Sequence, residues 1–316
     1  MTRLSTGGMT WDSGYHAPVL AREVAELLGT AEDVLDGTLG GGGHTLALLE
    51  RGVRVTGVDR DPRAIGEARE RLAAFGADGR FTAHQCNYGD LDAVAALRDA
   101  RFDGILLDLG VSSHQLDDET RGFTFRPGAL LDMRMGEDAV STAADFLNTA
   151  PESELAWVFR EYGDERKAPR LAREVTRRRA TRPFVTSDDF VGAIRGALGP
   201  TSGAPEFARL FQAVRIAIND ELKGLERALP MLRDHLVPGG TLVVIAYHSG
   251  EDRLVKHAFR EWSAECICPP KHPVCTCRGH ALGTLLTRRS RTAASDELAT
   301  NPRARSARLR AWRSAE

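Results

Sequence analysis

Strand-like and helix-like segments alternate along about the first hundred residues of this chain. The strand-like segments cover 32–38, 54–59, 80–86 and 102–109, and helix-like segments at 44–51, 62–75 and 91–99 separate them. Parallel strands need a crossover connection, which is usually a helix, so this alternation is typical of a parallel sheet with helices on both faces. The pattern predicts an α/β domain.

The alternation stops near residue 113 and returns near residue 238. Helical spacing covers 152–162, 166–180, 187–198 and 205–229, and a Pro-Gly-Gly turn followed by TLVVIAY then restores the strand pattern. We therefore predict a discontinuous α/β domain formed by residues 16–113 and 230–316. An all-helical insertion occupies 114–229, and a flexible tail covers 1–15. The last 25 or so residues have no clear period and are expected to be irregular.

Composition excludes several classes of protein. Apolar residues make up 42% of the chain and charged residues 27%, as in ordinary globular proteins. No apolar run approaches the ~20 residues that a membrane-spanning helix needs. The polar, Gly-rich N-terminus lacks the apolar centre of a signal peptide. These features predict a cytoplasmic protein that does not associate with membranes.

The net charge of −2 gives no indication of nucleic-acid binding, but the basic residues are clustered. Residues 166–182 contain eight basic side chains and one acid, Glu174, and residues 288–313 are also basic. Such clusters can bind phosphate backbones. A general preference for arginine, combined with a solvated helix face, explains the same pattern equally well.

A Gly-rich turn follows the first predicted strand and reads DGTLGGGGH from Asp36 to His44. Glycines at such a turn let the backbone approach a ligand closely. Asp59 ends the second predicted strand, where a carboxylate can accept both hydroxyls of a ribose. A tight turn with Asp59 capping the next helix is the structural alternative.

Three features favour S-adenosylmethionine over a dinucleotide as the ligand of this turn. Asp36 suits a cationic amino-acid group and would repel a pyrophosphate. The glycine spacing does not match GxGxxG strictly. Asp108 ends the strand at 102–109, where a methyltransferase places contacts to the base or the methyl acceptor.

Polar residues at two strand ends are candidates for the chemistry. Asp108 is followed by Ser112 and Ser113, and His248 follows the TLVVIAY strand. In doubly wound folds, ligands bind at the carboxyl ends of the strands. The acid-or-Asn, Pro-Pro, aromatic signature of amino-group methyltransferases is absent. A polar turn that uses serines, and a structural histidine, remain the alternatives.

Four of the five cysteines form two CxC pairs around a Pro-rich segment: Cys266, Cys268, Cys275 and Cys277. Four thiolates could bind zinc in a tetrahedral site, although CxC is tighter than the common CxxC spacing. Reduced thiols in a prolyl hairpin are the alternative, and disulfides are disfavoured without a signal peptide. Our site prediction therefore contains no metal.

Nine motifs occur in order along nearly the whole chain. They are HAPVL (16–20), DGTLGGGGH (36–44), VDRDP (58–62), DGILLDLGVSS (103–113), QLDD (115–118), RGFTFR (121–126), LDMRM (131–135), RIAINDEL (215–222) and HSGEDR (248–253). With these motifs the chain resembles the RsmH/MraW family of bacterial methyltransferases.

The resemblance implies a Rossmann-like, S-adenosylmethionine-dependent methyltransferase core with an inserted all-helical domain that recognises RNA. The implied product is N4-methylcytidine in the decoding region of 16S rRNA, within the small ribosomal subunit; homodimer formation is left open. The cofactor contacts implied or inferred are Asp36, Gly42, Gly43 and His44 at the methionine end, Asp59 at the ribose, Tyr88 at the adenine, Asp108 and Gln115. The catalytic candidates, in order, are Asp108, Ser112, Ser113 and His248.

This chain departs from the family pattern at two motifs. His114 follows DLGVSS where the family usually has proline. The family's usual SFHSLEDR reads AYHSGEDR at 246–253.

Two other classes of function compete with a methyltransferase. A non-catalytic RNA-binding factor could retain a relict cofactor fold, although the complete cofactor motifs argue against it. An NAD(P)-dependent oxidoreductase would need a GxGxxG turn and a hydride-transfer site, and neither is clear.

Overall fold

The computed structural model describes residues 18–316 except 113–114, 117, 270–273 and 275. The chain forms two compact units, one from Met1–Gly110 with Arg227–Glu316 and one from Val111–Glu226. We call them the sheet unit and the helical unit. The boundaries expected from the sequence, after 113 and before 230, differ from these by three residues. The predicted N-terminal tail at 1–15 lies outside the described residues.

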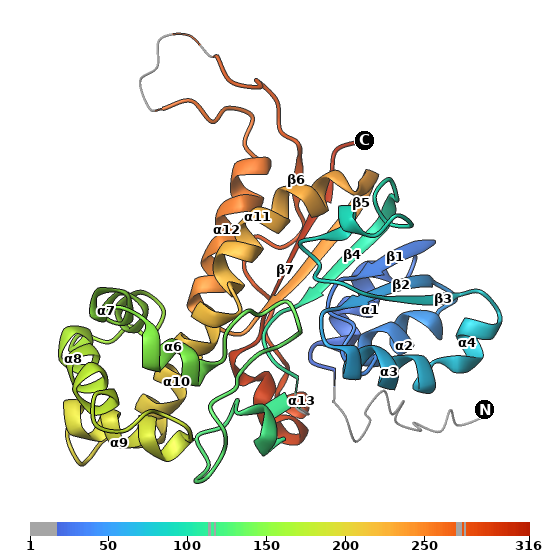
Figure 1. Ribbon diagram of the computed structural model, residues 1–316. Helices are drawn as coiled ribbons and strands as arrows, with labels where there is room; N and C mark the ends of the chain where they lie inside the picture. The colour runs from blue at the N-terminus through green and yellow to red at the C-terminus, as the bar shows by residue number, and fades with distance from the viewer. Residues whose placement is uncertain (1–17, 113–114, 117, 270–273, 275) are drawn as a thin grey trace. The chain divides into compact units, whose positions relative to one another are not determined.

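The sheet unit contains a seven-stranded sheet in the order β3-β2-β1-β4-β5-β7-β6 (Figure 1). The first five strands pair in parallel, and β7 is antiparallel to both β5 and β6. This arrangement confirms the predicted doubly wound α/β fold. The strands are β1 (Asp33–Asp36), β2 (Arg54–Asp59), β3 (Phe81–Gln85), β4 (Phe102–Asp108), β5 (Leu236–Ala246), β6 (Gly283–Leu285) and β7 (Arg308–Ser314).

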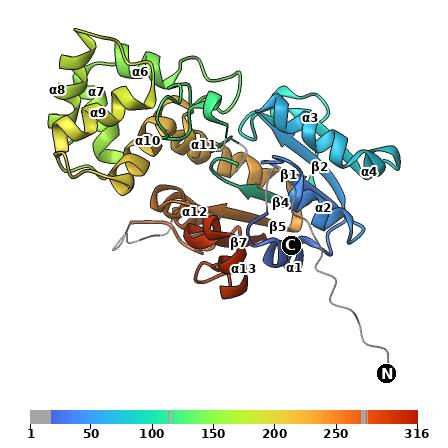
Figure 2. The ribbon, with the colours of Figure 1, turned by 90° about the horizontal axis from the view of Figure 1, so that it is seen from below.

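The central strands are apolar because both of their faces are covered. Ile105, Leu106 and Leu107 of β4 are fully buried, as a near-continuous apolar run in a parallel sheet should be. Helices α3 and α4 lie beside β2 and β3 (Figure 2). The helices of this unit are α1 (Ala21–Leu28), α2 (Gly43–Leu49), α3 (Pro62–Arg71), α4 (Ala73–Ala77), α12 (Ser249–Trp262) and α13 (Ser295–Thr300).

The chain order reverses between β1 and β4, which creates a topological switch point. From β1 the chain proceeds to β2 and β3 on one side, whereas β4 and β5 lie on the other. A crevice forms outside the carboxyl ends of the strands at such a point, and ligands bind there in open α/β sheets. Strands β1, β2 and β4 each end on an aspartate, namely Asp36, Asp59 and Asp108.

The helical unit has its own apolar core and contains no named strand among its described residues, as predicted. Phe190 lies between Phe159 and Phe211, with ring centroids 5.9 and 5.1 Å away. The helices are α6 (Ala143–Thr149), α7 (Glu152–Glu161), α8 (Ala168–Arg179), α9 (Ser187–Leu198) and α10 (Ala204–Ile218), and α11 (Glu221–Asp234) continues into the sheet unit.

The prediction of one long helix over 205–229 was wrong, because the chain breaks between α10 and α11. Asp220 adopts a left-handed backbone with φ of 51°. The buried Asn219 side chain accepts from Met135 N at 2.8 Å and donates to Met133 O at 2.8 Å. These bonds to a distant loop hold the break, and helical periodicity carries no sign of them.

Three other predictions of local structure need correction. The helix expected at 91–99 is only a short 3₁₀ turn, Leu91–Ala93. The helix expected at 62–75 is divided at Leu72 into α3 and α4. The C-terminal segment expected to be irregular contains β7, whose Leu309 and Ala311 alternate with arginines and are fully buried.

Replacing Trp312 with alanine tests the importance of β7. Trp312 is fully buried, packs 5.2 Å from Trp262 between ring centroids and donates from Nε1 to Ser263 Oγ at 3.1 Å. We expect W312A to lower the free energy of unfolding by about 3–5 kcal/mol in urea titrations. The matched control is W157A at a residue that is 44% exposed, for which the loss should be smaller. Equal losses would contradict the role given to β7.

Candidate active site

The Gly-rich turn places backbone that has no side chains at the carboxyl ends of β1 and β4. Gly37 N donates to Leu106 O at 2.9 Å, and a Cβ on Gly37 would lie 2.5 Å from Leu107 Cδ2. Gly42, predicted to contact the cofactor, has φ of 74° and is the N-cap of α2. Gly43 is buried as the first residue of that helix. The turn therefore needs its glycines for both conformation and space.

Asp59 is held at the end of β2 by two backbone donors. Its Oδ2 accepts from Gly40 N at 2.8 Å and its Oδ1 from Asp61 N at 2.9 Å. Burial raises the pKa of Asp59 to about 6. The carboxylate is thus fixed in orientation beside the Gly-rich turn and is ionised at neutral pH. This arrangement fits the predicted ribose contact, because a carboxylate oxygen can accept more than one hydrogen bond.

Asp36 is buried at the end of β1, and both of its oxygens are bonded within the turn. Oδ2 accepts from Thr45 Oγ1 at 2.7 Å, and Oδ1 accepts from Thr38 N at 3.2 Å. Burial raises the pKa of Asp36 to about 6. The residue therefore ties β1 to α2 in addition to supplying negative charge near the turn.

His44 and Asp108 face each other across the turn. His44 Nε2 lies 2.8 Å from Val19 O, and since a carbonyl only accepts, this nitrogen carries the proton. His44 Nδ1 is 3.7 Å from Asp108 Oδ2. Burial lowers the pKa of His44, which keeps the ring neutral. The unprotonated Nδ1 thus lies near the Asp108 carboxyl at a distance too long for a hydrogen bond.

Asp108 has a pKa close to neutral pH. Burial raises the pKa of Asp108 to about 7, and the negative charges of Glu251 and Glu297 act in the same direction. Tyr247 Oη donates to Asp108 Oδ1 at 2.9 Å, which opposes the rise. A carboxyl whose pKa lies close to the working pH can accept a proton and release it again.

Tyr247 is a site residue that the sequence analysis did not select. It replaces the family's usual phenylalanine, so the extra hydroxyl was visible in the sequence, but its partner was not. Strand β4 pairs with β5 so that Asp108 lies opposite Ile245, two residues before Tyr247. Only this register brings the hydroxyl to the carboxyl. Burial and the nearby Asp108 charge raise the pKa of Tyr247 well above its ordinary value, so the hydroxyl stays a donor.

His248 lies next to Tyr247 but its ring is directed to Glu251. His248 is the N-cap residue of α12, and Glu251 Oε2 accepts from Tyr247 N at 2.8 Å. His248 Nε2 is buried 3.2 Å from Glu251 Oε1, without hydrogen-bond geometry. Glu251 thus fixes the backbone at the start of α12, while Tyr247 is the side chain that bonds Asp108.

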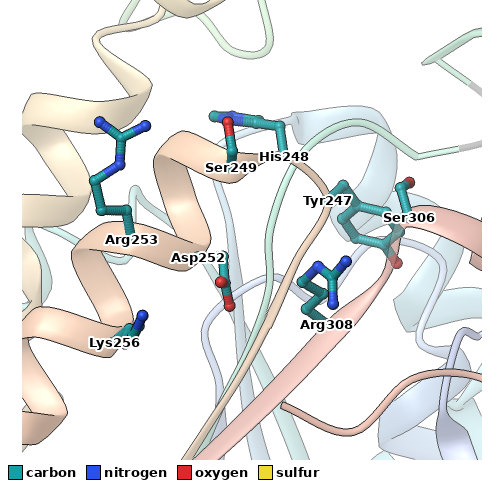
Figure 3. A pocket seen from close by; sticks show the side chains of 8 residues that line it. All are labelled: Tyr247, His248, Ser249, Asp252, Arg253, Lys256, Ser306 and Arg308. Carbon is teal, nitrogen blue, oxygen red and sulfur yellow. The ribbon is translucent and has the colours of Figure 1, made fainter. Parts of the chain in front are cut away.

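A cavity of about 450 Å³ adjoins Tyr247 and His248 (Figure 3). Its remaining lining comes from the first turns of α12 and from the segment that enters β7. These residues are Ser249, Asp252, Arg253, Lys256, Ser306 and Arg308. The cavity is therefore next to the Asp108–Tyr247 pair, and each residue that lines it has a polar or charged side chain.

Tyr88 lies against the Gly-rich turn, whereas two other predicted residues belong to the helical unit. A Cβ on Gly37 would lie 3.2 Å from Tyr88 Cβ. In the helical unit, Gln115 Oε1 accepts from Ser112 N at 3.0 Å, and Gln115 N donates to Ser112 Oγ at 3.2 Å. This reciprocal pair fixes the local turn. Ser113 lies outside the described residues.

Several cations of the basic stretch at 166–182 have partners within the helical unit. Arg177 and Arg178 both bond Glu174, with shortest distances of 2.7 Å. Arg179 Nη1 donates to the carbonyls of Leu147 and Ala150, at the end of α6 and just beyond it. Arg173 Nε also donates to Pro169 O at 3.3 Å. Four of the eight predicted cations therefore bond within the helical unit, which leaves fewer unpaired cations than the sequence suggests.

Comparison with known proteins agrees with the methyltransferase expectation. A protein from Gemmatimonas aurantiaca, named ribosomal RNA small subunit methyltransferase H, is 64% identical over 95% of this chain and 96% of its own length. The protein of that name from Heliobacterium modesticaldum is 46% identical over 94% of this chain and 97% of its own length.

The family comparison covers nearly the whole chain. The model of the MraW methylase family matches residues 13–315. This match confirms the resemblance inferred from the nine motifs and the expected use of S-adenosylmethionine. The chain belongs to the MraW methylase family.

Proposed function

We propose that this protein transfers a methyl group from S-adenosylmethionine to the exocyclic N4 of a cytidine in the decoding region of 16S rRNA. The relatives' name specifies small-subunit ribosomal RNA, and the motif resemblance specifies N4. The observation that carries the proposal is the largely buried Asp108 carboxyl at the switch point of the sheet, where Tyr247 Oη donates to it at 2.9 Å.

The residues at the Gly-rich turn fit the cofactor by shape and charge. We assign Asp59 to the ribose hydroxyls and Tyr88 to the adenine, since both adjoin the turn. We assign Asp36, Gly42, Gly43 and His44 to the methionine end, and Asp108 and Gln115 to the remaining contacts. When bound, the cofactor supplies an electrophilic methyl group on a sulfonium.

Asp108 provides what an aromatic amine needs in order to act as a nucleophile. The lone pair of cytosine N4 is delocalised into the ring, so the amine is weakly nucleophilic. An ionised Asp108 can accept a hydrogen bond from the amine, orient it and later take its proton. Tyr247 fixes the carboxyl in position. Ser112 and His248 rank lower because Ser112 bonds Gln115 and His248 faces Glu251.

The helical unit is proposed to recognise the RNA. A base must leave its stack to reach a buried carboxyl, which favours a single-stranded region or an assembled subunit. The outward cations near α8, such as Arg166, Arg170 and Arg182, are candidates for phosphate contacts. We also propose a cytoplasmic location, because an rRNA substrate would be found there. The described chain contains no helix long and apolar enough to cross a bilayer.

Transfer of labelled methyl groups tests this function. We expect label on small ribosomal subunits that lack the modification, recovered as N4-methylcytidine at one position, with naked 16S RNA measured alongside. D108A should lower the rate by about 10²–10⁴-fold, the usual contribution of a general base. The control D99A changes an exposed aspartate and should retain activity. Label on a different atom, or full activity in D108A, would refute the proposal.

The pH dependence of Y247F tests the Asp108–Tyr247 hydrogen bond. The bond favours the ionised form of Asp108, so its removal should raise the pKa of Asp108. Activity needs the ionised form and is lost as pH falls through that pKa. The acid limb of the rate profile should therefore move to higher pH, on the order of one unit for a hydrogen bond to a charged group. The control Y162F, in the helical unit, should leave the acid limb of the rate profile unchanged. A limb that is unmoved, or moved to lower pH, would contradict the bond's role.

A further inference from the structure

Three cysteine sulfurs gather in the segment between α12 and β6, away from the residues discussed above. The Sγ atoms of Cys266, Cys268 and Cys277 all lie within 4.8 Å of one another. Cys266 Sγ and Cys277 Sγ are 3.8 Å apart. Thiolates bound to one tetrahedral zinc ion at about 2.3 Å are separated by about 3.8 Å, so the spacing matches shared coordination.

Backbone donors point at these sulfurs. Ile267 N donates to Cys277 Sγ at 3.4 Å, and the backbone N–H groups of Thr276 and Cys277 donate to the Cys268 sulfur. Such bonds favour the thiolate, which is the form that binds a metal, and orient its lone pairs. All three cysteines are unbridged.

We propose that Cys266, Cys268 and Cys277 bind a zinc ion. Soft thiolate ligands favour zinc over hard cations such as magnesium or calcium. Cys275, the remaining member of the CxC pairs, lies outside the described residues. The sequence analysis predicted no metal and left open both a zinc site and reduced thiols. This proposal replaces that prediction with the zinc site.

The position of the cluster assigns the metal a structural role. Helix α12 starts at the carboxyl end of β5, where Tyr247 lies, and runs for 14 residues, or about 21 Å. The cysteines follow the carboxyl end of α12, and β6 is the next strand after them. Strand β6 pairs with the carboxyl end of β7, which in turn pairs with the middle of β5 near Thr241. A zinc ion there would fix the described cysteines between α12 and β6 and take no part in methyl transfer.

Elemental analysis of the full-length protein tests the zinc site. After dialysis against a weak chelator, we expect about one zinc per chain by mass spectrometry. We expect C266S and C277S to lose it and C86S, at the isolated cysteine, to retain it. Thiol titration should show the three cysteines becoming reactive only when a strong chelator removes the metal. Metal-free protein with reactive thiols, or a disulfide between Cys266 and Cys277 in peptide mapping, would overturn the assignment. Circular dichroism confirms that each variant is folded.

A second observation concerns the charge of the cavity beside Tyr247. Arg253 and Lys256 reach it from α12 and Arg308 from β7, as Figure 3 shows. In the part of the chain that the structure describes, these three cationic side chains form no hydrogen bond or ion pair. Like charges around one cavity repel each other, so an anion there would be stabilised.

The acid that lines the cavity is already neutralised. Asp252 accepts two hydrogen bonds from Arg310, at 2.7 and 3.0 Å, in a bidentate pair. The cavity therefore has a net positive charge, with hydroxyl donors from Ser249 and Ser306. This combination is suited to phosphate oxygens, which accept both charge-assisted and neutral hydrogen bonds.

We infer that this cavity binds RNA phosphates beside the target nucleotide, an inference that rests on the proposed function. Tyr247 links the two places, because it lines the cavity and also bonds Asp108. A phosphate held by Arg253, Lys256 and Arg308 would fix the backbone while the base reaches the Asp108 carboxyl. The sheet unit would then contribute its own RNA contacts in addition to those of the helical unit.

Binding of a 16S RNA fragment that contains the decoding region, measured without methyl transfer, tests the phosphate site. R253A, K256A and R308A should each weaken RNA binding. Each should also reduce the slope of log Kobs against log salt concentration by about 1, because one phosphate contact is lost. R308K should restore part of the affinity, and affinity for the cofactor should not change. The control R101A removes an exposed arginine that is not in the cavity lining.

The outcomes separate this inference from the proposed function. Unchanged RNA affinity and salt slope in all three variants would overturn the phosphate site, even if N4-methylcytidine is formed. Weaker RNA binding in the variants, with methylation found on another atom, would retain the phosphate site and refute the proposed reaction.

Discussion

The parallel pairing of β4 with both β1 and β5 is the constraint on which the site depends. It puts Asp36 and Asp108 at one edge of the sheet, and it carries Tyr247 to the Asp108 carboxyl from a segment 139 residues further along the chain. The apolar residues Ile105, Leu106 and Leu107 hold β4 between its neighbours. Because the edge is set by buried backbone pairing, the position of each strand-end carboxylate follows from the strand register.

The electrostatics of this edge follow from burial more than from pairing of opposite charges. Burial is the main cause of the raised pKa values of Asp36, Asp59 and Asp108. Tyr247 Oη donates to the Asp108 carboxyl, and the His44 ring lies 3.7 Å from it. A site of this kind attracts a cationic ligand and keeps one carboxyl ready to exchange a proton near neutral pH.

The sequence was sufficient for the fold class and for the acids at the strand ends, since these depend on short-range alternation and on the position of a residue at the end of a strand. The sequence was insufficient where a residue or strand far away along the chain determines the local structure. Asn219 breaks a helix through bonds to Met133 and Met135, and β7 exists because β5 offers it a partner. The Tyr247 hydroxyl was visible as a departure from the family pattern, but its bond to Asp108 depends on strand register.

We propose that the ionised carboxylates of Asp36 and Asp59 hold the methyl donor. Calorimetric binding of S-adenosylhomocysteine between pH 8 and pH 5 tests it most directly, because neither RNA nor turnover is involved. Asp36 and Asp59, with pKa values of about 6, are ionised at pH 8 and mostly protonated at pH 5. Affinity should therefore be constant above pH 7 and fall by up to about tenfold per pH unit below pH 6 for each carboxylate that must be ionised. Affinity that stays constant down to pH 5, in protein shown to remain folded, would contradict the account.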